Sequence, residues 1–468
     1  MSSGRSLLSV GLVVTFLSGC TVGPNYKKPA VPAPPEYRGL SPDQAGRSTA
    51  VSFGDQKWAD AFQDETLRDL IQTALKQNYD LRIAASRILE ARAQLGITRA
   101  DQLPTVSGTA SAANERTPQA VGRPAIDTSA SQVGLSAAWE LDFWGKFRRA
   151  TESSRASLLA QEWAQRQVMS SLVSDVANAY FQLRELDLEL EISRQTLATR
   201  RDSLRLTQIL ADGGATSMLD VRQAEQLVYA AAASIPDLER RIEQQENFLS
   251  ILLGENPQAI ARGRKLVDQP HAPEVPAGLP SSLLERRPDV RQAEQELIAA
   301  NAQIGVAKAD YFPHISLTAA GGYQSSALTG LFASPAGLWT LGGGAVQPVF
   351  EGGRIKNRVR LARARTQEAT LVYQRTVQEA FRDVSDSLVG YRKNQEFRVQ
   401  QEQLTHSAEE ATKLSNMRYK GGATSYLEVL DSDTRYFSAQ LSLAQAELRE
   451  LQSFVEIYRA LGGGWETP

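Results

Sequence analysis

The two halves of this sequence contain similar segments in the same order. The stretch YDLRIAASRILEARAQLGITRADQLPTVSGTA, which begins at Tyr79, matches PDVRQAEQELIAANAQIGVAKADYFPHISLTA, which begins at Pro288. The word GGATS also occurs twice, at 213–217 and at 421–425, each time between two long helical patterns. We therefore expect one supersecondary plan used twice, in which each half is a helix, two strands, a very long helix, a GGATS turn and another helix.

The helical pattern in each half is unusually long. Neither Gly nor Pro occurs from Lys146 to Asp212, and only Gly390 interrupts the stretch from Arg354 to Lys420. At 1.5 Å per residue such helices would run to roughly 100 Å, more than a globular domain needs. Apolar residues recur at steps of four and three, which is the seam of a coiled coil. The seam positions are Leu172, Val176, Ala179, Leu183, Leu186 and Leu190 in the first half, and Leu427, Leu430, Thr434, Phe437, Leu441, Ala444, Leu448, Leu451, Val455 and Tyr458 in the second.

Four segments are predicted to be β-strands. SQVGLSAAWELDF, from Ser131, and PHISLTAAGGY, from Pro313, alternate apolar residues with small or polar ones, and weaker strands are predicted over 105–113 and 337–350. Their length of about 10 residues suits tilted transmembrane strands. Four strands cannot close a barrel, so we expect a ring of identical chains, in which three chains would supply twelve strands. The alternative is a soluble antiparallel sheet with one wet face.

The N-terminus carries an export signal. MSSGRSLLSVGLVVTFLSGC has a basic residue, an apolar core and small residues directly before Cys20, the only cysteine. This placement predicts that Cys20 is cleaved and acylated as in a bacterial lipoprotein, and Thr21 after it favours sorting to the outer membrane. An ordinary signal peptide followed by a stray thiol is the alternative. The proline-rich tract that follows is predicted to be an extended tether.

The chain divides into six segments on these patterns. They are a signal peptide (1–19), a lipidated tether (20–57), a first structural repeat (58–258), a linker (259–280), a second structural repeat (281–464) and a tail (465–468). With 51 basic and 53 acidic residues the net charge is −2, which gives no basic surface for nucleic acid. The three histidines are scattered and no nucleophile or metal motif is present, so we expect no enzyme and no cofactor beyond the lipid on Cys20.

Taken together, these residues resemble the TolC-like outer membrane factors, in particular their lipoprotein branch of OprM and NodT type. The marks are Cys20 with Gly23, Pro24, Tyr26 and Pro29; Trp58, Phe62, Asp64, Leu67 and Leu70; Glu140, Leu141, Asp142, Trp144 and Gly145; LLERRPDVRQAEQEL from Leu283; and PVFEGGRI from Pro348. The resemblance covers the whole mature chain.

The resemblance implies a fold, a location and partners. The fold would be a homotrimer with a twelve-stranded outer membrane β-barrel, four strands from each chain, continued into the periplasm by a long α-helical barrel. The partners would be a periplasmic adaptor and an inner-membrane pump, most often of the resistance-nodulation-division type. The chain would then be the exit duct through which drugs or other small toxic compounds leave the cell. The outer membrane channel of a type I protein secretion system is the alternative.

The two GGATS words are predicted to be compact turns at the far periplasmic ends of the helices. Gly213 and Gly421 suit the left-handed residue that ends a helix, and the serines that follow can cap the next helix. SMLD from Ser217 and SYLE from Ser425 have capping-box spacing, which would use the carboxylates of Asp220 and Glu428.

The resemblance also implies a gate and a docking surface at these turns. The gate acids would be Asp431, Glu428 and Asp220, with Tyr419 lining the gate, and Thr424 stands where the family often has a basic residue. For Asp220 and Glu428 helix capping is an equal alternative, and for Asp431 the alternative is a solvated surface acid. The adaptor would contact the turns themselves, which are Gly213, Gly214, Ala215, Thr216 and Ser217, and Gly421, Gly422, Ala423, Thr424 and Ser425.

Overall fold

The structure is a computed structural model that describes residues 21–38, 52–119, 121–122, 124–270, 275–278, 280–333 and 335–465. The predicted signal peptide and Cys20 lie outside these residues. The described chain forms two compact units. The first, here called the sheet unit, takes the residues up to Ala30, Arg87–Glu162 and Gln292–Gln374. The second, here called the hairpin unit, takes the described residues of Val31–Ser86, Trp163–Arg291 and the chain from Arg375 onward.

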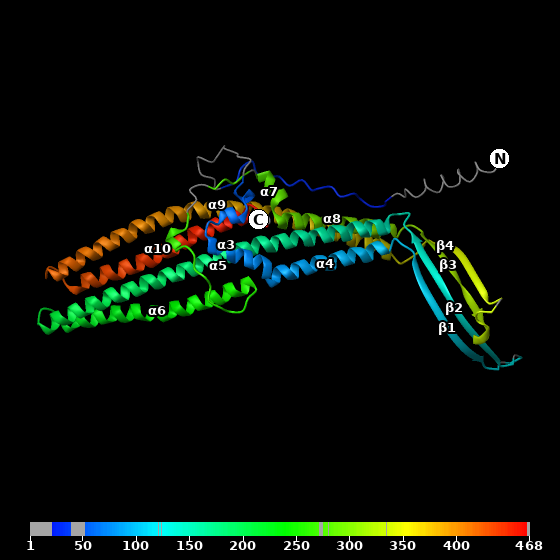
Figure 1. The fold of residues 1–468 in the computed structure, drawn as a ribbon. Helices are drawn as coiled ribbons and strands as arrows, with labels where there is room; N and C mark the ends of the chain where they lie inside the picture. The colour runs from blue at the N-terminus through cyan, green and yellow to red at the C-terminus, as the bar shows by residue number, and fades with distance from the viewer. Residues whose placement is uncertain are drawn as a thin grey trace. The chain divides into compact units, whose positions relative to one another are not determined.

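The sheet unit contains a four-stranded antiparallel sheet in the order β1-β2-β3-β4 (Figure 1). Its strands are β1 (Thr105–Thr117), β2 (Ile126–Leu141), β3 (His314–Ser325) and β4 (Gly337–Val346), with the short 3-10 helix η3 (Leu328–Gly330) between the last two. The register places Trp139 opposite Leu317, and Leu317 opposite Gly343. Two large apolar side chains therefore pair across β2 and β3, opposite a glycine of β4, as the predicted alternation requires.

Several strand boundaries differ from the prediction, among them the start of β2, which is Ile126 rather than Ser131. β1 continues beyond 113 to Thr117, because its polar end pairs residue by residue with the start of β2 as far as Ile126. β4 ends at Val346 rather than at Phe350, because His314, the first residue of β3, pairs with Val346 and Pro348 has no N–H to donate to a ladder. The end of β1 was not predicted because its residues are polar. The end of β4 was predicted too late because apolar residues continue beyond the strand.

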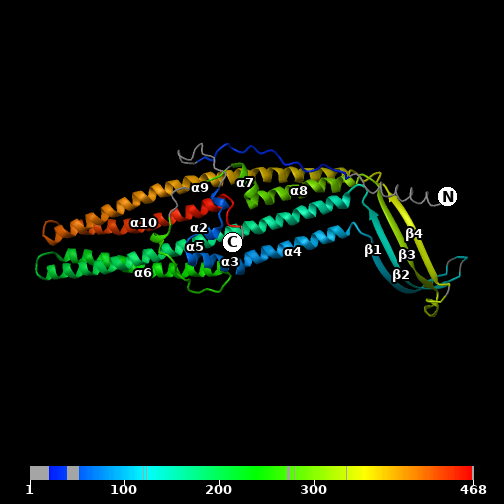
Figure 2. The same ribbon diagram turned by 45° about the horizontal axis from the view of Figure 1, so that its top comes forward.

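The long helices have the predicted bounds. α5 (Lys146–Asp212) and α9 (Arg354–Lys420) have 67 residues each, and the repeated segments form α4 (Tyr79–Ala100) and α8 (Pro288–Ala309), with 22 residues each. α6 (Met218–Leu253) runs back beside α5, and α10 (Tyr426–Ala460) runs back beside α9 (Figures 1 and 2). Among the described residues, every helix lacks the long apolar stretch that a membrane-crossing helix requires.

Short elements complete the hairpin unit. They are η1 (Phe53–Asp55), α2 (Trp58–Ala61), α3 (Glu65–Gln77), η2 (Leu266–Asp268) and α7 (Pro280–Arg286). Aromatic rings from η1 and α10 meet in its core, where the ring centroids of Phe53 and Phe454 lie 4.9 Å apart and those of Phe53 and Tyr458 lie 5.3 Å apart. The C-terminal part of α10 is thus held by packing against an element that is distant in sequence.

The predicted seam holds in α5 and fails near the start of α10. Leu172, Val176 and the three seam residues that follow them to Leu186 are buried, and Leu190 is half-buried. In α10, by contrast, Leu427 and Thr434 are exposed, whereas Tyr426 and Val429 are buried. The buried face at this end is set by contact with Ala224 of α6, so it lies one position away from the heptad seam.

Candidate functional site

The two GGATS turns have the same backbone geometry. In the first, the N–H of Gly214 donates to the carbonyl of Ala211 at 3.0 Å, and the N–H of Ala215 donates to the carbonyl of Leu210 at 2.8 Å. In the second, Gly422 and Ala423 repeat these two bonds at 3.0 and 2.9 Å. This pair of bonds is the Schellman end of a helix. Each turn is therefore a compact helix hairpin, as predicted.

The left-handed residue in each turn is the second glycine, not the first. Gly214 has φ of 73° and Gly422 has φ of 70°, whereas Gly213 and Gly421 do not have positive φ. The prediction was wrong by one residue because each helix continues further than expected: the N–H of Gly213 still bonds to the carbonyl of Ile209 at 3.1 Å. The left-handed position falls on the next residue, where glycine avoids the steric cost of a Cβ.

The expected capping box is only partly present. Ser217 accepts a hydrogen bond from the N–H of Asp220 at 3.4 Å, but the side chain of Ser425 makes no cap hydrogen bond. The carboxylates of Asp220 and Glu428 instead accept from the hydroxyls of Thr216 and Thr424, one turn earlier. The threonines of GGATS therefore hold these two acids at the turn, a role that capping-box spacing did not suggest.

Two of the predicted gate acids are accessible and have basic neighbours. The side chain of Asp431 is 60% exposed, and its Oδ2 lies 2.8 Å from Nε of Arg435, one turn later in α10. Glu428 is half-exposed, with its Oε1 3.6 Å from Nε of Arg418. An exposed ion pair is weak, so each carboxylate can still meet a cation. Their role as gate acids remains a prediction.

Tyr419 lies in the last turn of α9, just before the second GGATS turn, and packs against a cluster that includes Ala224 of α6. Its ring packs edge-on against Tyr426, with 5.3 Å between the ring centroids. Tyr426 and Val429 form a buried cluster with Ala224 of α6. Burial raises the pKa of Tyr426 above its ordinary value. The hydroxyl of Tyr419 is buried with no hydrogen-bond partner among the described residues, and its gate-lining role stays a prediction.

An ion pair of buried Arg200 with half-buried Asp433, next to this cluster, was missed by the sequence reasoning. Nε of Arg200, in α5, lies 2.8 Å from Oδ2 of Asp433, in α10, and the two side chains are 4% and 16% exposed. Arg200 also donates to the carbonyl of Leu227 at 3.0 Å and stands 4.9 Å from the ring centroid of Phe437. It therefore joins the two hairpins. Nothing in the sequence distinguishes it from the exposed Arg201 beside it.

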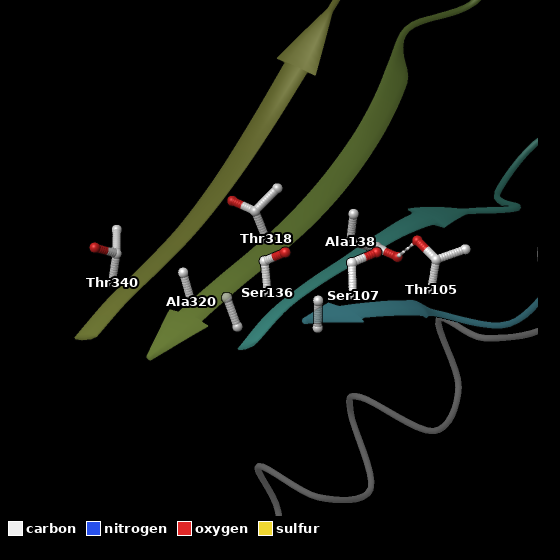
Figure 3. A pocket seen from close by; sticks show the side chains of 9 residues that line it. Thr105, Ser107, Ser136, Ala138, Thr318, Ala320 and Thr340 are labelled. Atoms are coloured by element: carbon white, nitrogen blue, oxygen red, sulfur yellow. Dashed lines mark hydrogen bonds between the residues drawn. The ribbon is translucent and has the colours of Figure 1, made fainter. Parts of the chain in front are cut away.

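The two faces of the sheet differ as the alternation predicted. Figure 3 shows small side chains from four strands standing on one face, where they line a hollow of about 200 Å³. These residues are Thr105, Ser107, Ser136, Ala138, Thr318, Ala320 and Thr340. The opposite face carries Trp139, Leu317 and Leu341. A sheet with one small, polar face and one apolar face suits a wall between water and hydrocarbon.

The family model described as outer membrane efflux protein matches residues 70–255 and 279–463, one match for each sequence repeat. The chain belongs to this family, which is one of transport channels.

Relatives of known name are similar to this chain in sequence over nearly its whole length. It is 37% identical to the toluene efflux pump outer membrane protein TtgC of Pseudomonas putida over 98% of this chain and 96% of the relative. It is 33% identical to the cation efflux system protein CusC of Escherichia coli over 97% and 98% of the two chains. Among solved structures, the outer-membrane channel OprN superimposes with a TM-score of 0.88 at 33% identity, over 95% of this chain and all of that one. This chain is thus an outer membrane channel that serves as the exit duct of an efflux system.

Proposed function

We propose that this chain forms, as a homotrimer, the exit duct of a tripartite system that expels solvents, antibiotics or other small toxic compounds. The other two components would be a periplasmic adaptor and an inner-membrane pump of the resistance-nodulation-division type. Relatives are named for the efflux of toluene, of antibiotics and of cations, which supports small toxic compounds as the cargo class. The observation that carries the proposal is the sheet with two unlike faces.

The sheet supports a trimer because its edges are open in one chain. β1 and β4 are the outer strands, so the outward edge of each has no partner strand within the described residues. Hydrocarbon does not tolerate such edges, and a ring of chains removes them. With four strands from each of three chains, the ring would have twelve strands, with the small polar side chains lining the water-filled interior.

The turns support the adaptor contact. Large apolar side chains are exposed on the helices that flank both turns, among them Ile209, Leu219 and Met417. Exposed apolar residues clustered at one end of two hairpins are typical of a surface that binds another protein. We assign the contact to the turns 213–217 and 421–425, and the gate to Asp431, Glu428, Asp220 and Tyr419. The lipid on Cys20 would anchor the chain in the outer membrane.

A gene deletion tests this function. We expect deletion to raise intracellular accumulation of toluene and of several antibiotics and to lower the concentrations that inhibit growth, because the exit duct is lost. Full complementation is expected from the wild-type gene and from an Asp202→Asn variant, a control at an exposed acid. Unchanged sensitivity together with loss of a polypeptide from the culture medium would instead indicate protein secretion. Co-purification of the adaptor after cross-linking at a Leu219→Cys variant tests the tripartite assembly.

A further inference from the structure

Residues 21–28, here called the N-terminal strap, are seated on the sheet unit. The N–H of Val22 donates to the carbonyl of Trp144 at 3.0 Å. Gly23 has φ of 109°, and a Cβ at this position would lie 2.5 Å from the Cα of Gly305 in α8. The strap therefore rests directly on the backbone of α8, where only glycine fits on either side.

A buried arginine fastens the strap from the other side. Arg149 of α5 is 4% exposed and donates to the Oδ1 of Asn25 at 2.7 Å and to the carbonyls of Val22 and Gly23 at 3.4 and 3.5 Å. Oε2 of Glu152 lies 2.7 Å from its Nη1. A buried guanidinium held this way is costly to unseat. Residues 22–25 of the predicted tether thus have a fixed position on α5.

Further contacts fix the rest of the strap. Asn301 donates to the carbonyl of Pro24 at 3.0 Å, and both Tyr26 and Lys28 reach the buried carboxylate of Glu294 at 3.3 Å. These bonds involve α8, whereas those of Arg149 involve α5. The strap is therefore held by two helices.

The strap begins at the corner between β2 and α5. A Cβ at Gly145, which has φ of 77°, would lie 2.7 Å from the Cγ2 of Thr21 and 3.0 Å from its Cα. Trp144, beside it, stacks on Phe312 with 4.6 Å between the ring centroids. Tryptophan at the end of a membrane strand is typical of the membrane interface. A lipid on the residue before Thr21 would start from this corner.

A hollow on the apolar face of the sheet lies near that corner. It measures about 550 Å³, and its lining includes Pro104, Ala137, Trp139, Leu317, Leu341 and Gly343. Ala137, Ala319 and Gly343 keep it open because their side chains are small. The Trp139 ring at its side is held by a hydrogen bond from Nε1 to the carbonyl of Gln102, at 2.9 Å.

We propose that this hollow binds one acyl chain of the lipid carried by Cys20. The proposal rests on the lipidation included in the proposed function. Gly145 and Trp139 are six positions apart in the chain, so their Cα atoms are at most about 21 Å apart. One leaflet of the hydrocarbon core is about 15 Å deep, so an acyl chain has a comparable reach. Because the strap holds Thr21, the residue next to the acylated cysteine, little further ordering is needed to seat an acyl chain.

An intramolecular photo-cross-link tests the proposal. Cells are fed a fatty acid that carries a diazirine, so that the mature lipoprotein bears the probe, and the acylated protein is irradiated in native membranes and digested for mass spectrometry. We expect cross-links at 137–139, 317–319 and 341–343. In a parallel sample the diazirine is carried only by phospholipid, and cross-links should then spread over the apolar face. If cross-links from the probe on Cys20 were also spread evenly over the apolar face, the proposal would be overturned.

Two pairs of variants sharpen the test. Gly343→Leu should fill the hollow and lower the cross-link yield there severalfold, whereas Ala345→Leu, one row away on the same face and outside the lining, should leave it unchanged. Arg149→Ala should unseat the strap and scatter the cross-links, whereas Arg155→Ala, at an exposed position of α5, should not. Equal yields within either pair would contradict docking. Absence of an acyl mass at Cys20 would overturn both lipidation and docking, whereas an acylated protein cross-linked elsewhere would overturn docking alone.

Discussion

At the scale of single residues, Asp64 is a buried carboxylate that accepts five hydrogen bonds within the hairpin unit. It is 1% exposed, and its Oδ1 accepts from the N–H groups of Thr66 and Leu67 at 3.0 and 3.3 Å, which caps α3. Its Oδ2 accepts from three further donors, the hydroxyl of Tyr180, the N–H of Arg264 and Nε2 of Gln269, at 3.0, 3.0 and 2.9 Å. One carboxylate thus joins α3, α5 and the segment around η2.

Asp64 is predicted to make the stability of the protein sensitive to acid. Burial alone would raise the pKa of Asp64, but the hydrogen bonds from Gln269, Tyr180 and the backbone outweigh it and lower the pKa. The stabilisation is therefore present above the unfolded-state pKa of about 4 and is lost as the pH falls through the lower folded-state value. We expect Asp64→Asn to cost about 3 kcal/mol at neutral pH, because buried donors lose a charged acceptor.

Thermal unfolding of the detergent-solubilised protein across pH measures this effect. The difference between wild type and Asp64→Asn should shrink as the pH falls below about 4, because the unfolded chain then takes up a proton at Asp64, and it should vanish below the lower folded-state pKa. Asp69→Asn, at an exposed position of α3, should behave as wild type throughout. A gap between wild type and Asp64→Asn that stays constant down to the lowest pH would contradict the assignment.

Residue-level predictions succeeded where local sequence decides the outcome. The turns at GGATS were predictable because two glycines and a following serine suit a helix end and a helix start. Which glycine is left-handed depends on where the helix stops, and this differed by one residue at both turns. The bonds from Thr216 and Thr424 to the acids were not predictable, since a threonine one turn before a carboxylate has no distinctive pattern.

At the scale of elements, the two hairpins are joined near their turns by the pair Arg200 and Asp433. Arg200 is buried and Asp433 is half-buried, and Arg200 also bonds to a backbone carbonyl of α6. Removing one partner of such a pair leaves an uncompensated charge, whereas replacing both with apolar residues is often neutral. The pair therefore fixes how α10 lies against α5 more than it adds net stability.

A double-mutant cycle tests the joint between the hairpins. Arg200→Leu alone should destabilise the protein by about 3 to 5 kcal/mol, and Asp433→Leu added to it should recover much of that loss. Arg201→Leu, at the exposed neighbour, should change stability by less than about 0.5 kcal/mol. Additive effects in the cycle, measured by unfolding of the solubilised protein, would show that the two side chains do not act together.

The length of α5 was predictable because Gly and Pro are absent between Lys146 and Asp212, which leaves nothing to end a helix there. In α9 the single Gly390 does not end the helix. The burial pattern of α10 near its turn was not predictable. Tyr426 and Val429 are buried there by α6, a helix from the other repeat, and tertiary contact overrode the heptad pattern. The predicted ends of the strands were wrong for a related reason, because pairing with the neighbouring strand decides where a strand ends and composition does not.

At the scale of the whole molecule, each unit is built from matching parts of the two sequence repeats. The sheet unit takes Arg87–Glu162 from the first half and Gln292–Gln374 from the second. The repeat was therefore sufficient to predict the architecture, although the repeat boundaries do not coincide with the units. One chain still exposes Leu341, Trp339 and Leu427. Large exposed apolar side chains on a strand face and beside a turn are expected to be covered by lipid or by other protein chains.

The effect of Asp431 on the channel depends on more than one copy of the chain. In a homotrimer Asp431 would occur three times around one axis, and three like charges at a constriction attract cations and bind divalent ions. Asp431→Asn should therefore lower cation selectivity and relieve divalent-ion block in single-channel recordings, each severalfold. Because Arg435 lies 2.8 Å from Asp431 and offsets its charge, Arg435→Gln should shift both in the opposite direction. Asp202, whose Oδ1 lies 2.6 Å from Nη2 of Arg205 on the exposed surface of α5, provides the control, and Asp202→Asn should leave selectivity unchanged. If Asp431→Asn channels kept wild-type selectivity, Asp431 would be a solvated surface acid and the constriction would have to be formed by other residues.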